Sequence, residues 1–173
     1  GRTGIGKLLL GSVAEEILRT VTCPVLTVGP QADLSRGSDG HIREILYATD
    51  FASESQAAAA YAVSLAEEFQ ARLVLLHVLP KLDPNDLVMA SDVEASTRAL
   101  LEKIVPSEAK DWCKPEYFVK QGDPADKILE MAQLRESDMI VLGVRREEGV
   151  SGAAIHLPIA TIHKVVSGAT CPV

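Results

Sequence analysis

Short apolar runs alternate with longer amphipathic stretches from residue 41 onward. The apolar runs lie at residues 45–48, 73–78, 117–119 and 139–142. The run at 73–78 shows no alternation of apolar and polar positions, which is typical of a strand buried on both faces of a parallel sheet. The pattern therefore predicts four strands in this part of the chain, and the terminal Cys-Pro-Val at 171–173 begins a fifth.

The stretches between these runs predict helices at 53–70, 87–105, from 124 onward and at 159–166. In the first helix, Ala58, Ala62, Leu65 and Phe69 recur at helical spacing and are expected to form the buried face. Strands that alternate with helices in this way indicate right-handed βαβ units. We predict an α/β fold with a doubly wound, open, parallel five-stranded sheet.

A short internal repeat divides the chain. Thr-Cys-Pro-Val at 22–25 recurs at 170–173, and each copy follows a stretch predicted to be helical. Residues 31–40 are polar and read as a linker. We therefore expect 1–30 to be the C-terminal helix and strand of a first domain. Residues 41–173 would then be a second copy with a clipped last strand, so that the chain is a piece of a tandem-repeat protein.

Charge and composition exclude several classes of function. The chain has 24 Asp and Glu against 17 Lys and Arg, and only 4% aromatic residues, which argues against a nucleic-acid partner. Its apolar runs are too short for a bilayer, so no membrane association is expected. Three cysteines without a CxxC pair, and four histidines without metal-ligand spacing, predict neither a disulfide framework nor a zinc site. A cytoplasmic location is the expectation.

Three segments resemble the universal stress protein family. Residues 45–53 resemble its first strand and the Asp that ends it, residues 122–143 its third helix and fourth strand, and residues 11–26 its last helix and strand. The resemblance implies a non-enzymatic role in the stress response or its regulation, with ATP as a possible ligand. It also implies association through the last strands, as a homodimer or as a pseudo-dimer within one chain.

The nucleotide-binding members carry Gly-x2-Gly-x9-Gly-Ser/Thr between the fourth strand and the last helix. Gly1, Gly11 and Ser12 match the second half of this motif and would be the phosphate-binding remnant of the first domain. Glycines let backbone N–H groups approach a phosphate, and a helix N-terminus favours the anion. A plain loop and helix cap at 11–12 is the other interpretation.

The complete domain departs from this motif. Gly143 holds the position of its first glycine, but Arg146 stands at the second. Ile159 and Ala160 stand where Gly-Ser is expected, and neither offers an open backbone with a hydroxyl. Nucleotide binding is therefore expected to be lost or weak in this domain.

The nucleotide-binding crevice of the family lies at the carboxyl ends of the first and fourth strands. The resemblance makes Asp50 the acceptor for a ribose hydroxyl, opposite Gly143, with Ala48 and Val78 beside the adenine. An N-cap of the following helix is an equally good interpretation of Asp50. An ATP-binding regulatory domain that uses Asp50 and the loop after Gly143 is thus one alternative function.

Enzyme classes that share this topology lack their signatures here. The glycine-rich loop of ATP-pyrophosphatases, the His-x-Gly-His of nucleotidyltransferases and the Gly-x-Ser-x-Gly elbow are absent from the sequence. His77 is expected to be a hydrogen-bonded core or loop histidine. The remaining alternative is a structural dimerisation module, in which residues 24–28 lie beside the strand that begins at Cys171 or exchange between chains.

Overall fold

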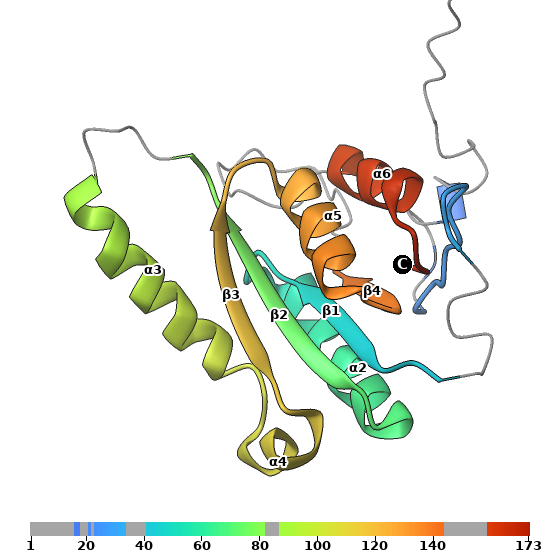
Figure 1. Ribbon diagram of the computed structural model, residues 1–173, viewed down its shortest axis with the longest axis horizontal. Helices are drawn as coiled ribbons and strands as arrows, with labels where there is room; N and C mark the ends of the chain where they lie inside the picture. The colour runs from blue at the N-terminus through green and yellow to red at the C-terminus, as the bar shows by residue number, and fades with distance from the viewer. Residues whose placement is uncertain (1–15, 18–20, 22, 34–40, 82–86, 144–158) are drawn as a thin grey trace, which may run out of the picture.

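The chain is described from a computed structural model (Figure 1). The description covers residues 16–17, 21, 23–33, 41–81, 87–143 and 159–173. Most of the stretch before the first Thr-Cys-Pro-Val, which is predicted to be helical, therefore lies outside the described residues, as do Gly1, Gly11, Ser12 and Arg146.

Four parallel strands form a single sheet in the order β3-β2-β1-β4. They are β1 (Glu44–Ala48), β2 (Arg72–Leu79), β3 (Glu116–Gln121) and β4 (Met139–Leu142). The chain moves from β1 through β2 to β3 in one direction, and β4 then pairs with the other side of β1 (Figure 1). This reversal of strand order is the doubly wound arrangement predicted from the alternation of runs.

The described sheet has four strands where five were expected. Residues 171–173 lie beside β4, with the N–H of Ile140 donating to the carbonyl oxygen of Pro172 over 2.9 Å. Pro172 has no N–H that could donate to β4, so these three residues do not form a regular ladder of hydrogen bonds with that strand. The predicted fifth strand is thus a short extended segment at the edge of β4.

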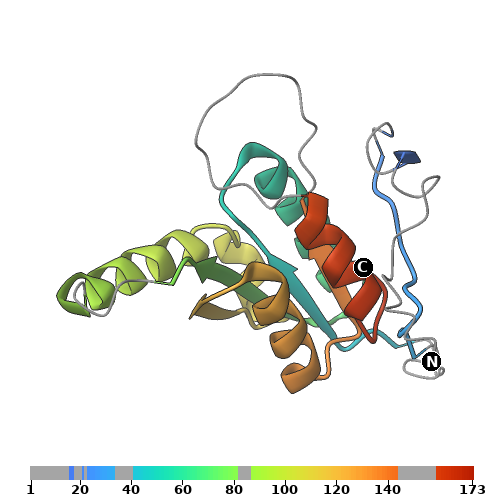
Figure 2. The same ribbon diagram turned by 90° about the horizontal axis from the view of Figure 1, so that it is seen from above.

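Helices cover both faces of the sheet (Figures 1 and 2). One face packs against α2 (Ser53–Phe69) and the C-terminal end of α3 (Leu87–Glu102). The other packs against α5 (Pro124–Arg135) and α6 (Ile159–Gly168). The sequence pattern did not predict the 3₁₀ helix η2 (Ser107–Ala109) or the single turn α4 (Lys110–Cys113) that leads into β3.

The buried face of α2 matches the expected one only in part. Ala62 is fully buried, and Ala58 and Leu65 are partly buried against the core. The side chain of Phe69 is 39% exposed, so the prediction that it belongs to the core is wrong. The most deeply buried apolar stripe of the helix leaves Phe69 at its end turned toward solvent and consists of Ala59, Ala62 and Ala66.

Asp123 caps the N-terminus of α5. One of its carboxylate oxygens accepts from the N–H of Asp126 over 3.0 Å, and Pro124 is the first residue of the helix. The same oxygen accepts from Nζ of Lys164 on α6 over 3.0 Å, so the cap also joins two neighbouring helices. These hydrogen bonds, led by that from Asp126, lower the pKa of Asp123.

We expect Asp123→Ala to lower the free energy of unfolding by about 1 kcal/mol, because α5 loses its N-cap. The folded-state pKa is lowered, so the contribution is present above the unfolded pKa and is lost as pH falls through the folded one. Urea unfolding at neutral and acidic pH measures both effects. Glu130→Ala on the same helix, a mostly exposed carboxylate, is the control. Equal losses in the two variants would contradict the assignment.

Candidate functional site

The strand register brings two of the predicted site residues to one edge of the sheet. Ala48 of β1 lies beside Leu142 of β4 and Leu76 of β2. Asp50 therefore leaves β1 close to the point where Gly143 leaves β4. This edge, between the carboxyl ends of β1 and β4, is where ligands bind in open α/β sheets.

The carboxylate of Asp50 is engaged in the turn that precedes α2. Its Oδ1 accepts from the N–H of Ala52 over 2.9 Å and from Oγ of Ser55 over 2.5 Å. The N-cap position of α2 falls on Ala52, which has no side-chain capping bond. Asp50 is thus not the N-cap itself, but it holds the backbone just before the helix.

The residue after Asp50 has an unusual backbone conformation. Phe51 has φ of 62°, in the left-handed region that non-glycine residues rarely occupy. Its N–H donates to Oγ1 of Thr49 over 3.0 Å, and its side chain packs against the core on the α2 side of the sheet. The turn therefore carries an aromatic ring inward at the end of β1.

The ring of Phe51 stacks on His77 at the end of β2, with 4.6 Å between ring centroids. Nδ1 of His77 lies 2.7 Å from the carbonyl oxygen of Thr49, so this nitrogen carries the proton and donates. Burial lowers the pKa of His77, which keeps the ring neutral at neutral pH. His77 is hydrogen-bonded, as expected, whereas its aromatic partner could not be predicted from the sequence.

The residues expected beside an adenine are parts of the core. Ala48 is 2% exposed and belongs to the apolar cluster under α5 and α6, and Val78 packs against the same cluster. Gly143 is buried and is the last described residue after β4. The loop after Gly143 and the side chain of Ile159 lie outside the described residues, so the phosphate end of the expected site does too.

Residues 23–29, which we call the arm, run along the edge of the sheet beyond β4 (Figure 2). The N–H of Thr27 donates to the carbonyl oxygen of Val173 over 2.7 Å. In return, the N–H of Val173 donates to the carbonyl oxygen of Thr27 over 2.9 Å. Such a mutual exchange defines an antiparallel pair. Oγ1 of Thr27 donates to the same Val173 oxygen over 2.9 Å. The arm therefore lies beside residues 171–173, one of the two arrangements considered for the dimerisation module.

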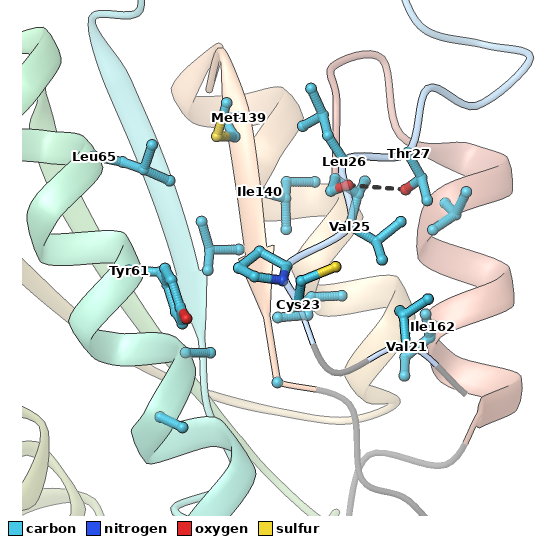
Figure 3. A pocket seen from close by; sticks show the side chains of 18 of the residues that line it. Val21, Cys23, Val25, Leu26, Thr27, Tyr61, Leu65, Met139, Ile140 and Ile162 are labelled. Carbon is cyan, nitrogen blue, oxygen red and sulfur yellow. Dashed lines mark hydrogen bonds between the residues drawn. The ribbon is translucent and has the colours of Figure 1, made fainter. Parts of the chain in front are cut away.

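A pocket of about 690 Å³ lies between the arm, α2, β4 and α6 (Figure 3). Its walls include Tyr61 and Leu65 of α2, Met139 and Val141 of β4, and Leu26 of the arm. Most of the lining is apolar. Sequence reasoning missed this pocket because its walls come from separate segments between residues 21 and 173, which only the folded chain brings together.

A charged cluster occupies the opposite, amino-terminal edge of the sheet. The Glu44 carboxylate, 2% exposed, accepts from Nε and Nη2 of Arg135 over 3.2 and 3.1 Å. Nη2 of Arg72 is also 3.1 Å from it, and Arg135 further bonds Glu116. These contacts raise the pKa of Arg135, with the Glu44 hydrogen bond as the largest cause. The cluster ties three strands to the end of α5 and is far from the carboxyl edge.

Neither a metal centre nor a membrane span is found in the part of the chain that the structure describes. No group of three or more His, Cys, Asp or Glu side chains there is placed to hold a metal ion. None of the described helices has both the length and the apolar character needed to cross a bilayer.

Comparison with known proteins identifies the relatives of the chain. The profile of the universal stress protein family matches residues 1–29 and 41–173. Universal stress protein MJ0531 of Methanocaldococcus jannaschii is 27% identical over 147 residues, which cover 80% of this chain and 84% of that protein. The solved structure of universal stress protein UspA from Lactobacillus plantarum superposes with a TM-score of 0.59 at 26% identity, over 76% of this chain and 94% of that one.

A further solved relative is a universal stress protein in complex with cAMP. It superposes with a TM-score of 0.52 at 21% identity, over 75% of this chain and 93% of that one. Its fold agrees with the parallel sheet and flanking helices described above. With the family profile matching nearly the whole sequence, the chain belongs to the universal stress protein family.

Proposed function

We propose that this chain is a non-enzymatic regulatory domain of the stress response, in which adenine-nucleotide binding by residues 41–173 is lost or weak. The observation that carries the proposal is the engagement of Asp50. Its Oδ1 already accepts from Ala52 and Ser55 within the same turn. A ribose hydroxyl that donates to this same oxygen would have to compete with these hydrogen bonds.

The changes in the phosphate-binding motif support the same proposal. Arg146, Ile159 and Ala160 replace the small residues of the phosphate-binding motif. A side chain at these positions keeps a phosphate away from the backbone N–H groups.

Calorimetric titration of the chain with ATP, and separately with cAMP, tests this function. We expect no saturable binding with a Kd below about 1 mM, which corresponds to about −4 kcal/mol. Ser55→Ala releases one donor from Asp50 and is expected to leave binding no weaker than in the wild type. Saturable micromolar binding that is lost in Asp50→Ala, in a variant with an unchanged circular dichroism spectrum, would contradict the proposal.

That contrary result would favour the second candidate, an ATP-binding regulatory domain that uses Asp50 and the loop after Gly143. The observation in its favour is the solved relative in complex with cAMP. Because the two candidates predict opposite outcomes of the same titration, one experiment distinguishes them.

We further propose that residues 1–30 are the end of a preceding copy of the domain, so that the arm and residues 171–173 form a pseudo-dimer within one chain. The family profile matches 1–29 separately from 41–173. In the Thr-Cys-Pro-Val repeat, Val173 is equivalent to Val25, and it pairs with Thr27. This antiparallel register is compatible with a pseudo-two-fold axis at Leu26, midway between Val25 and Thr27.

The proposed cellular setting follows from the cysteines. Cys113 and Cys171 are buried and unbridged, and Cys23 is exposed and unbridged. Free thiols are the usual state in a reducing compartment, which supports a cytoplasmic location as part of the proposal.

A further inference from the structure

The segment 29–33, which we call the clasp, begins at the last residue of the arm and starts with a tight turn. The N–H of Ala32 donates to the carbonyl oxygen of Gly29 over 3.1 Å, which closes a β-turn with Pro30 at its second position. Proline fixes its own φ angle, so this turn is favoured before the segment makes any other contact. The clasp includes the first three residues of the stretch expected to be a linker, 31–40.

At its start the clasp lies directly against the last turn of α6. Gly29 is buried, and a Cβ at this position would lie 1.8 Å from the carbonyl oxygen of Val166. The hydrogen that glycine carries in place of a Cβ therefore points toward this oxygen, as in a weak C–H···O contact. Val166 is one of the last four residues of α6, whose carbonyl oxygens have no partner within the helix. The clasp thus packs on the C-terminal end of α6.

At its end the clasp is bonded to the segment that follows α6. The N–H of Asp33 donates to the carbonyl oxygen of Thr170 over 2.9 Å. Two residues before the clasp, Thr27 exchanges two main-chain hydrogen bonds with Val173. Residues 27–33 are therefore attached at both ends, and at Gly29 between them, to one continuous stretch of the chain, 166–173.

We propose that the clasp joins the arm rigidly to α6, so that residues 27–33 and 166–173 open and close as one unit and do not flank a flexible joint. A single hydrogen-bonded pair such as Thr27–Val173 is too short to be stable by itself. The bond from Asp33 adds a second attachment, and the turn at Pro30 limits the freedom of the chain between the two.

This device lies within the described residues and does not depend on the function proposed above. Only its consequence for a preceding copy of the domain rests on that proposal. Such a copy would keep one orientation relative to α6, because the chain that leaves it is fixed to that helix. A flexible linker would let the two copies move independently.

Hydrogen exchange in the whole 173-residue chain, followed by NMR, tests whether the unit opens cooperatively. In the wild type we expect the amides of Thr27, Asp33 and Val173 to be protected alike, with protection factors within about threefold of one another. The amides of a flexible linker would instead exchange at the rate of an unstructured peptide.

Two variants open the clasp in different ways. Asp33→Pro removes the N–H that bonds Thr170 and is expected to speed exchange at Thr27 and Val173 by about fivefold, the effect of one typical hydrogen bond. Asp33→Ala is the matched control, because it keeps this N–H, and the difference between the two variants isolates the hydrogen bond. Pro30→Gly removes no donor but loosens the turn, and should speed the same amides by about twofold or more.

Two results would overturn the proposal. Exchange of Asp33 at the rate of an unstructured peptide, while Thr27 stays protected, would show a flexible linker. Protection of Thr27 and Val173 at the wild-type level in both Asp33→Pro and Pro30→Gly would show that the clasp and the Thr27–Val173 pair open independently. Neither readout involves a nucleotide, so the result is separate from that of the ATP titration.

Discussion

Substitution of Arg135 by alanine is expected to lower the free energy of unfolding by about 3 kcal/mol, although the residue lies at the end of a helix. Its guanidinium makes two hydrogen bonds to Glu44, whose carboxylate is almost completely buried in β1. Without it, that charge keeps Ser137 and the half-exposed Arg72 as partners. A buried charge that loses its main partner is far more costly than a broken surface pair.

Chemical denaturation of Arg135→Ala measures this loss. Lys127→Ala is the control, because it removes a lysine from an exposed pair with Glu130 on the same helix and should cost about 1 kcal/mol or less. Adding Glu44→Gln to Arg135→Ala removes the buried charge that has lost its main partner and should recover part of the stability. If Arg135→Ala costs no more than Lys127→Ala, the cluster does not stabilise the fold.

Substitution of Gly29 by alanine is expected to detach the arm while the rest of the domain stays folded. A Cβ at this position would lie 1.8 Å from the carbonyl oxygen of Val166 and 3.0 Å from its carbon. Both atoms belong to the backbone of α6, which cannot move aside as a side chain can. The arm must therefore shift, and the pairing of Thr27 with Val173 should be lost with it.

Hydrogen exchange reports this detachment residue by residue. In Gly29→Ala the amides of Thr27 and Val173 should exchange about tenfold faster or more, with little change in the strands β1 and β2. Gly168→Ala is the matched control, because the added Cβ there meets only the side chain of Leu129, which can rotate away. Protection of Thr27 in Gly29→Ala equal to that in the wild type would contradict the expectation.

The order of strands and helices could be predicted because each strand is a compact apolar run. The run at 139–142 coincides with β4, and β2 extends the run at 73–78 by one residue at each end. The face of α2 could not be predicted in the same way. Its alanines form two overlapping stripes, and only contact with the sheet buries Ala59 and Ala66 most deeply and leaves Phe69 exposed.

The candidate site was only partly accessible from the sequence. The topology alone places Asp50 near Gly143, since both follow strands that pair in the sheet. The stacking of Phe51 on His77 depends on a left-handed backbone angle at Phe51 and on the register of β1 with β2. Neither the backbone angle of Phe51 nor this register can be predicted from residue type. Left-handed positions in particular are usually occupied by glycine or asparagine, not by phenylalanine.

The pairing of Thr27 with Val173 has a consequence for the order of folding. The two residues are 146 positions apart, so their hydrogen bonds close a loop that contains the whole of the sheet. Loop-closure entropy opposes such a contact until the intervening chain is compact. The arm therefore docks as a late step, after β1 to β4 have assembled, and its attachment reports that the domain beneath it is complete.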